Sequence, residues 1–173
     1  MLMKLAGSAA VLFACAGIGF FAASEVGRRE RQLRSLYASF LLIQGDIRYQ
    51  KSSLPEAFFS VSGRMPGDFT DFFASVSERL YAHESESFEQ VFCEELKKSC
   101  RESALKKRDI ALLGQLSGMC GQMDDQLQVT AIDWYLEQSA QILKELSREN
   151  REKITLLRRM GILAGIFLLV LLL

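Results

Sequence analysis

The sequence is poor in the side chains that carry most enzymatic and metal chemistry. It contains a single histidine, His83, and no two of its four cysteines have the CxxC spacing of a zinc or redox site. Walker-type glycine loops and the motifs GxGxxG, GxSxG and HExxH are also missing. We therefore predict no catalytic residue, no cofactor and no metal, and we interpret His83, beside Glu84 and Glu86, as a surface residue.

Proline and net charge are scarce as well. With 2 prolines and a composition that is 49% hydrophobic and 24% charged, the chain suits a packed helical protein rather than a disordered one. Residues 25–159 hold 20 basic and 21 acidic side chains, a formal charge of −1. A nucleic-acid scaffold would carry a clear positive excess, so we expect no nucleic-acid partner.

Two smaller features have structural explanations. Cys93 and Cys100 are seven positions apart, which on a helix separates their Cα atoms by about 10 Å, too far for a disulfide. We expect free, buried or half-buried thiols in a reducing compartment.

Asp124 and Asp125 are adjacent, so on a helix they point about 100° apart. We interpret them as a helix cap rather than a catalytic carboxylate pair.

The N-terminal region contains a long uncharged run. Residues 5–24 lie between Lys4 and Glu25 without a charge, and as a helix they span about 30 Å, the thickness of a bilayer core. We predict that residues 1–24 are a transmembrane anchor. Two alternatives stay open: a secretory signal cleaved near Ala22-Ala23-Ser24, or lipidation at Cys15.

The C-terminal run is shorter. Residues 160–173 are uncharged and reach only about 21 Å as a helix, less than a full span. Arg158 and Arg159 can snorkel to the lipid surface, so we predict that this segment is seated in the membrane. Gly161 and Gly165 form a GxxxG step, which favours packing against another membrane helix.

Charge asymmetry indicates the orientation. One basic side chain, Lys4, precedes the first apolar run. Many basic residues lie on the inner side of both runs: Arg28, Arg29, Arg31, Arg34, Arg148, Arg151, Lys153, Arg158 and Arg159. The positive-inside rule therefore predicts that residues 25–159 form a cytoplasmic domain.

Apolar residues in this middle part recur at helical spacing, and no stretch alternates with period 2. We predict an all-α fold, a six-helix antiparallel bundle flanked by N- and C-terminal membrane helices. The helices are expected from Arg28 to about Lys51, from Ser53 to the break at 63–67, from Asp68 to about Leu80, over Phe88–Cys100, over Ala104–Met119, and from Asp124 or Asp125 past Arg159.

The sequence also predicts which residues cap the helices and which helix faces are buried. Ser53 and Glu56 form a capping box, and Asp68 is a candidate cap for the third helix. Most phenylalanines are predicted to be core, whereas Phe59 and Phe73 are candidates for a second, exposed apolar surface. The final helix is predicted to bury one face, composed of Leu127, Ala131, Trp134, Ile142 and Leu146.

In order and spacing, a series of short motifs resembles the stage III sporulation protein AB family of endospore-forming bacteria. They are Met3–Gly7, Arg31-Gln32-Leu33-Arg34, Asp46-Ile47-x-Tyr49, Ser53-Leu54-Pro55-x-Ala57, Leu113-Gly114 with Leu116, Asp124 with Gln126, and Arg158-x-x-Gly161-x-Leu163-Ala164-Gly165 before the Leu/Val tail. Family members often have Thr-Pro-Leu where this chain has Ser-Leu-Pro, and residues 65–103 match only in helical pattern.

The resemblance implies a part in the channel that joins mother cell and forespore. It implies a soluble domain like that of F-class platform proteins of type II secretion and type IV pili, located at the mother-cell membrane. Partners would be a secretion-type ATPase of the same operon, other membrane subunits and the lipid bilayer. Expected contacts are Arg28, Arg29, Arg31, Arg34, Arg158, Arg159, Gly161 and Gly165. The alternative is a membrane-tethered regulatory or ligand-sensing helical domain, which would show convergent polar residues inside the bundle.

Overall fold

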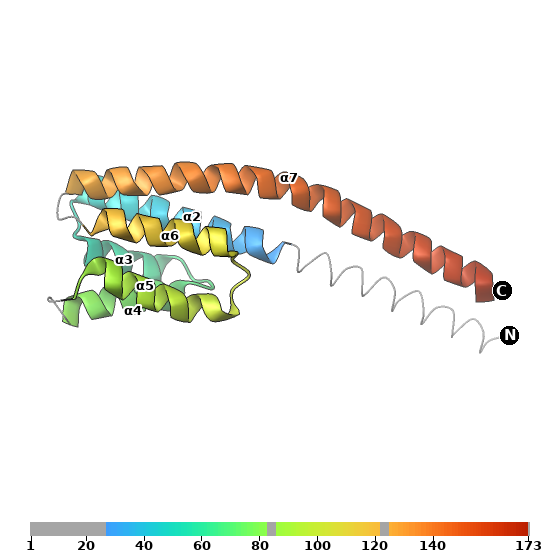
Figure 1. Ribbon diagram of the computed structural model, residues 1–173, viewed down its shortest axis with the longest axis horizontal. Coiled ribbons are helices and arrows are strands. Elements are labelled where there is room, and N and C mark those ends of the chain that lie inside the picture. The colour runs from blue at the N-terminus through green and yellow to red at the C-terminus, as the bar shows by residue number, and fades with distance from the viewer. Residues whose placement is uncertain (1–26, 83–85, 122–124, 173) are drawn as a thin grey trace. The chain divides into compact units, whose positions relative to one another are not determined.

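The computed structural model describes residues 27–82, 86–121 and 125–172, with the backbone alone at 125, 157–158, 161–162 and 164–172. Within these residues the secondary structure is entirely helical, and the prediction of six α-helices is confirmed. In chain order they are α2 (Arg28–Gly45), α3 (Leu54–Arg64), α4 (Thr70–Ala82), α5 (Phe88–Ser99), α6 (Lys107–Cys120) and α7 (Asp125–Leu172) (Figure 1). A π-helical turn, η1 (Asp46–Gln50), follows α2, and a 3-10 turn, η2 (Cys100–Glu102), follows α5.

The chain divides into two compact units, which are described separately. One, here called the core unit, comprises residues 31–143. The other, the end unit, comprises residues 1–30 and 144–173. In the end unit, the buried Asn150 donates a hydrogen bond of 2.8 Å to the Glu30 carboxylate, which joins α7 to the start of α2.

The core unit is organised around aromatic rings. Phe40 of α2 contacts Phe58 of α3, Phe73 of α4, Phe92 of α5 and Tyr135 of α7, with ring centroids 4.7–6.5 Å apart. All five rings are at most 1% exposed. Leu113 and Leu116 of α6 complete the same apolar cluster, so all six helices contribute to one core.

Several contacts fix the direction of neighbouring helices. Ser77 in the second half of α4 donates to the Pro55 carbonyl at the start of α3, 2.9 Å away, and Phe73, one turn earlier, packs on Phe58, so these two helices run antiparallel. Gln44 and Arg48 donate to the Asp133 carboxylate while Phe40 packs on Tyr135, so α2 and the first part of α7 are also antiparallel.

A buried amide joins α2 to two loops. Gln32 is 3% exposed; its Oε1 accepts from the Ala104 backbone N–H at 2.8 Å, and its Nε2 donates to Asp68 at 2.7 Å. This contact explains why Asp68 is not the cap of the third helix. The helix begins two residues later, at Thr70, whose hydroxyl lies 2.8 Å from the Gly67 backbone N–H and accepts from it.

Other local predictions have mixed outcomes. The capping box of α3 is present, with the Ser53 backbone N–H donating to Glu56 at 2.8 Å. The fifth helix starts at Lys107 rather than Ala104, because the Asp109 carboxylate accepts from the Lys106 N–H and sets the start there. Phe59 is 68% exposed, as predicted. The prediction for Phe73 is wrong, since that ring lies in the core.

The predicted face of the last helix is also wrong in part. Leu127 is 46% exposed and Trp134 is only partly buried. The buried face instead follows a line through Ala131, Tyr135, Ser139 and Ile142, one residue of rotation away from Trp134.

Neither flanking membrane helix is shown. The predicted anchor, residues 1–24, lies outside the described residues, and α7 continues unbroken through the predicted C-terminal segment to Leu172. No helix in the described part of the chain combines the length and the apolar character that a membrane span requires.

Truncating a ring at the centre of the aromatic cluster is expected to be costly. Phe92 is fully buried among four other rings, so Phe92→Ala should lower the free energy of unfolding by about 3–5 kcal/mol. The control Phe59→Ala removes an exposed ring and should change it by less than about 0.5 kcal/mol. Denaturant unfolding of the full chain in mild detergent, followed by circular dichroism, measures both. Equal losses would contradict the assignment of Phe92 to the core.

Candidate interaction surfaces

The predicted basic contacts are only partly visible. Arg28 and Arg29 open α2 and are half-buried, whereas Arg31 and Arg34 are exposed one turn further on. Arg159 is exposed on α7, and the side chain of Arg158 lies outside the description, as do the surroundings of Gly161 and Gly165. Their roles at a membrane surface therefore stay predictions.

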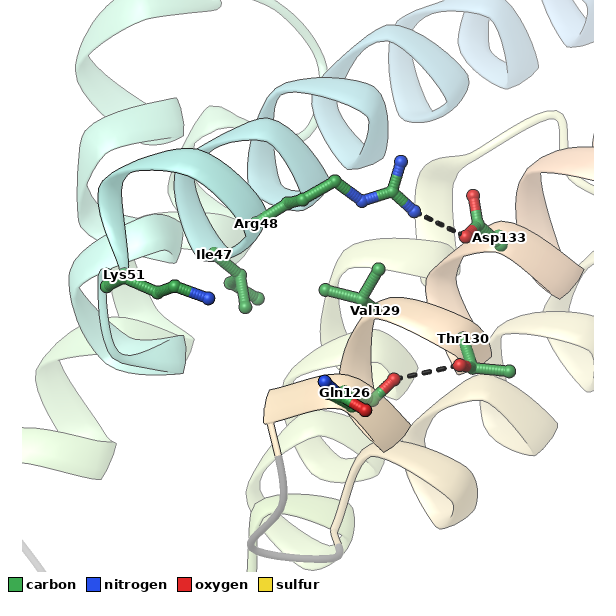
Figure 2. Close-up of a pocket in the computed structure, with 7 residues that line it drawn as sticks. All are labelled: Ile47, Arg48, Lys51, Gln126, Val129, Thr130 and Asp133. Carbon is green, nitrogen blue, oxygen red and sulfur yellow. Dashed lines mark hydrogen bonds and ion pairs between the residues drawn. The ribbon is translucent and has the colours of Figure 1, made fainter.

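A polar pocket lies where α2 ends and α7 begins, and sequence reasoning did not identify it. Its volume is about 310 Å³, and its lining is Ile47, Arg48, Lys51, Gln126, Val129, Thr130 and Asp133 (Figure 2). Arg48 Nη2 donates to Asp133 Oδ2 at 2.7 Å, and Gln44 donates to the other carboxylate oxygen. Asp133 is thus occupied on both oxygens and holds the Arg48 guanidinium in place.

The backbone at this pocket departs from ordinary helical geometry. The five residues of η1 form a π-helix, a rare turn that recurs at functional sites. It ends at Lys51, which has φ 57° and ψ 28°, the only positive φ among the described non-glycine residues. Glycine or asparagine is usual in this left-handed conformation, so a lysine here carries a backbone cost of about 1–2 kcal/mol.

A shallow groove between α3 and α4 exposes aromatic surface. Its lining is Phe59, Ala74, Ser77, Glu78, Tyr81 and Ala82. Phe59 is 68% and Tyr81 56% exposed. Tyr49 in η1 is exposed to 80%. Exposed aromatic residues of this kind are enriched in the energetic centres of protein–protein interfaces.

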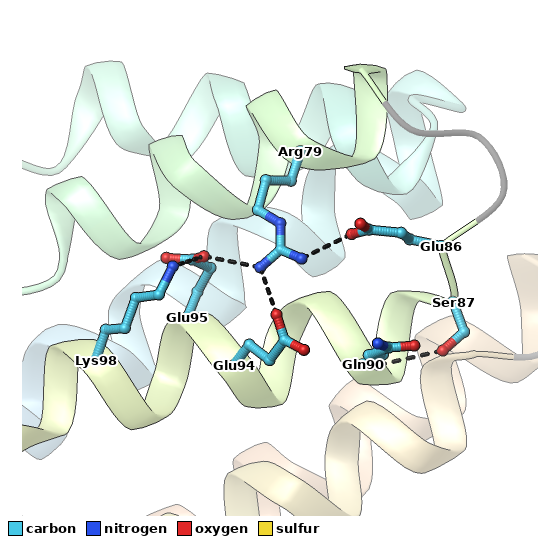
Figure 3. Close-up of polar contacts among 7 residues, drawn as sticks. All are labelled: Arg79, Glu86, Ser87, Gln90, Glu94, Glu95 and Lys98. Carbon is cyan, nitrogen blue, oxygen red and sulfur yellow. Dashed lines mark hydrogen bonds and ion pairs between the residues drawn. The ribbon is translucent and has the colours of Figure 1, made fainter.

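An ion-pair cluster connects α4 to α5 (Figure 3). Arg79 donates to Glu86, Glu94 and Glu95 at 2.7–2.9 Å, and Lys98 donates to Glu95 at 2.6 Å. Burial alone would raise the pKa of Glu95, but the hydrogen bonds from Lys98 and Arg79 outweigh it and lower that pKa below its ordinary value of 4.5. Because the members satisfy one another, we interpret the cluster as structural.

Three hydroxyls in the core are unusual. Those of Ser39, Tyr135 and Ser139 are buried and have no hydrogen-bond partner among the described residues. Burial raises the pKa of the Tyr135 phenol far above its usual range and outweighs the opposite effect of the nearby Ser139 hydroxyl, while the Asp109 carboxylate adds to the rise, so the phenol stays protonated. These are the polar core groups that the ligand-sensing alternative would need.

Three of the four cysteines lie in the described part of the chain. Cys93, Cys100 and Cys120 are free, as predicted, and burial raises the pKa of Cys120 to about 12. A thiol of that pKa is a poor nucleophile at neutral pH. Among the described residues, no three His, Cys, Asp or Glu side chains are grouped to hold a metal ion. His83 lies outside them.

In the described residues, an aromatic core is thus combined with exposed aromatic and charged side chains on the surface. The family model "Stage III sporulation protein AB" matches residues 4–173, so the chain belongs to that family. A relative named "Stage III sporulation protein AB", from Bacillus subtilis (strain 168), is 25% identical over 99% of both chains.

A solved structure named "Stage III sporulation protein AB (SpoIIIAB)" has the same fold. Its TM-score is 0.65 at 22% identity, and the match covers 72% of this chain and 97% of that one. Family membership supports a role in sporulation.

The Arg79 cluster predicts a specific pH dependence. A carboxylate whose pKa is lowered by folding contributes stability above its unfolded pKa, near 4.5 here, and loses it as the pH falls through the folded pKa. Glu95→Gln should therefore lower stability at pH 7 and flatten its decline in acid. Thermal unfolding between pH 7 and pH 3 measures this. Glu137→Gln on the exposed side of α7 is the control, and a Glu95→Gln slope equal to that of wild type would contradict the role of Glu95.

Removing the buried Tyr135 hydroxyl tests whether the core serves packing alone or contains a ligand site. Removing an unpartnered buried hydroxyl relieves a desolvation cost, so Tyr135→Phe should leave the free energy of unfolding unchanged or raise it by up to about 1 kcal/mol. Sporulation efficiency should be unaffected. A variant that is stable but fails to sporulate would instead favour a ligand site in the core.

Proposed function

We propose that this chain is a non-catalytic membrane platform of the channel between mother cell and forespore. Its helical domain lies in the cytoplasm, anchored to the mother-cell membrane, and docks a secretion-type ATPase encoded in the same operon. Other membrane subunits pack against its apolar segments, with Gly161 and Gly165 as contacts. Its action is to hold and align partners, so no bond is made or broken on it.

The observation that carries this proposal is the continuity of α7. One helix of 48 residues supplies Ala131, Ile132 and Tyr135 to the aromatic core and then continues, without a break, into the apolar residues from Met160 onward (Figure 1). The same hydrogen-bonded element therefore belongs to the packed core and to the segment predicted to enter lipid. Such an element suits a protein that couples a cytoplasmic partner to membrane subunits.

The support for membrane attachment comes from the sequence. The uncharged run of residues 5–24 has the length of a bilayer span, and the basic residues concentrate on the inner side of both apolar runs. Arg28, Arg29, Arg31, Arg34, Arg158 and Arg159, here called the basic collar, would meet the anionic lipid surface. Each such residue contributes about 1 kcal/mol of attraction near that surface.

The ligand-sensing domain is the second candidate, and one observation favours it. Ser39, Tyr135 and Ser139 place three unpartnered hydroxyls inside the core unit. The core around them is otherwise aliphatic and aromatic, which suits packing better than ligand recognition.

Reversing the charge of the collar tests the platform. Changing Arg28, Arg29, Arg31 and Arg34 together to Glu should disturb orientation and reduce ATPase co-purification from sporulating cells at least about tenfold, because the positive-inside bias is lost. Orientation is read by the accessibility of a cysteine introduced at Leu173, in a background without the native cysteines.

The matched control changes four exposed basic residues of the core unit to Glu: Lys97, Arg101, Lys107 and Arg108. It alters the net charge equally and should keep the wild-type orientation. Normal orientation and ATPase recovery in the collar variant would contradict the role of the collar, and a wild-type chain that recovers no ATPase would contradict the platform.

A further inference from the structure

The pocket between η1 and α7 has features that folding alone does not explain. It lies entirely within the core unit, just beyond the end of α2, and that end is about 21 Å along the helix from Arg31 at the rise of 1.5 Å per residue. On the proposed function, Arg31 is near the membrane and the pocket is distant from it along the helix. A cytoplasmic partner can therefore reach this end of the core unit.

The charge in the pocket is unbalanced. Of its two cations, Arg48 is held by Asp133, at 2.7 Å. The Lys51 backbone N–H donates to the Asp46 carbonyl. Its side chain forms no ion pair or hydrogen bond with the described residues, and Figure 2 shows its ammonium nitrogen beside Ile47, pointing in the direction of α7. Counting Arg48, Lys51 and Asp133, the lining carries a charge of +1 that is centred on Lys51. A single anionic group would neutralise it.

The local backbone places Lys51 there at a cost. The π-helical turn and the left-handed conformation at Lys51 together direct the side chain to the pocket. A glycine would cap the turn with less strain but would leave no cation. Val129 adds a half-buried apolar side chain to a lining that is otherwise mostly polar and exposed.

We propose that this pocket receives a carboxylate side chain of the partner ATPase, with Lys51 donating to it and Arg48 beside it. The inference rests on the proposed function and names the contact by which the core unit docks that partner. The charge of the pocket fits one carboxylate, its volume admits an acidic side chain with room to spare, and the exposed Tyr49 in the same turn offers additional contact surface.

Substitutions at Lys51 separate binding from folding. The assay uses the full chain in lipid nanodiscs and the purified ATPase. Lys51→Gly should have a melting temperature equal to or above that of wild type, because glycine tolerates the left-handed conformation, yet bind the ATPase about tenfold more weakly. Lys51→Glu should bind more weakly still, and Lys51→Arg should bind within about twofold of wild type. Lys107→Glu, an exposed change of the same charge, should bind as wild type does.

Carbodiimide coupling identifies the group in the pocket. This reagent joins an amine to a carboxylate in direct contact, so wild type should yield a Lys51 amide to an Asp or Glu of the ATPase, detected by mass spectrometry. Lys51→Arg should lose that product while keeping its affinity. Because binding is charge-assisted, affinity should fall between 50 mM and 500 mM salt.

Each of the other possible results would contradict one part of the proposal. If wild type binds the ATPase and the Lys51 variants bind equally well, the pocket is not the contact while the platform stands. Equal weakening by Lys107→Glu would indicate unspecific attraction, and displacement of the ATPase by millimolar inorganic phosphate would indicate a small-anion site. A wild-type chain that binds no ATPase at any salt concentration overturns the platform, and the pocket assignment with it.

Discussion

The core unit depends on the packing of one ring, Phe40. Its position in α2 brings it into contact with rings from α3, α4, α5 and α7 at 4.7–6.5 Å. Aromatic pairs at these distances and tilted angles contribute beyond the area they bury. A single side chain thus connects five of the six helices of the core unit.

The helical content could be predicted because it follows from local rules. Breaks at Gly63–Gly67 and the capping box of Ser53 and Glu56 are short-range signals, and six helices appear in the predicted order, although two of them begin two or three residues later than predicted. Which face of each helix is buried was harder to predict. Phe73 and Leu127 both lie on or beside a line of apolar residues at helical spacing. Whether such a residue is buried depends on contacts with distant helices, which the spacing does not reveal.

Binding features were the least predictable part. The pocket at η1 needs a π-helical turn, a left-handed Lys51 and the approach of Asp133 from a helix more than eighty positions later. Amino-acid composition predicts none of these features, since a lysine in the sequence does not indicate the left-handed conformation. The one available signal was the run Asp46-Ile47-x-Tyr49, which carried the family resemblance but no geometry. The role of the basic collar is likewise a matter of membrane context rather than of local pattern.

The two hydrogen bonds of the buried Gln32 amide have a consequence for the order in which the core unit folds. They join residues 36 and 72 positions away in the chain, Asp68 and Ala104, through a single side chain. Closing such long loops costs entropy that is regained only when both partners are in place. We therefore expect the two bonds to form late in folding. Their loss would hasten unfolding and leave the folding rate nearly unchanged, which makes Gln32 a determinant of how long the native state lasts.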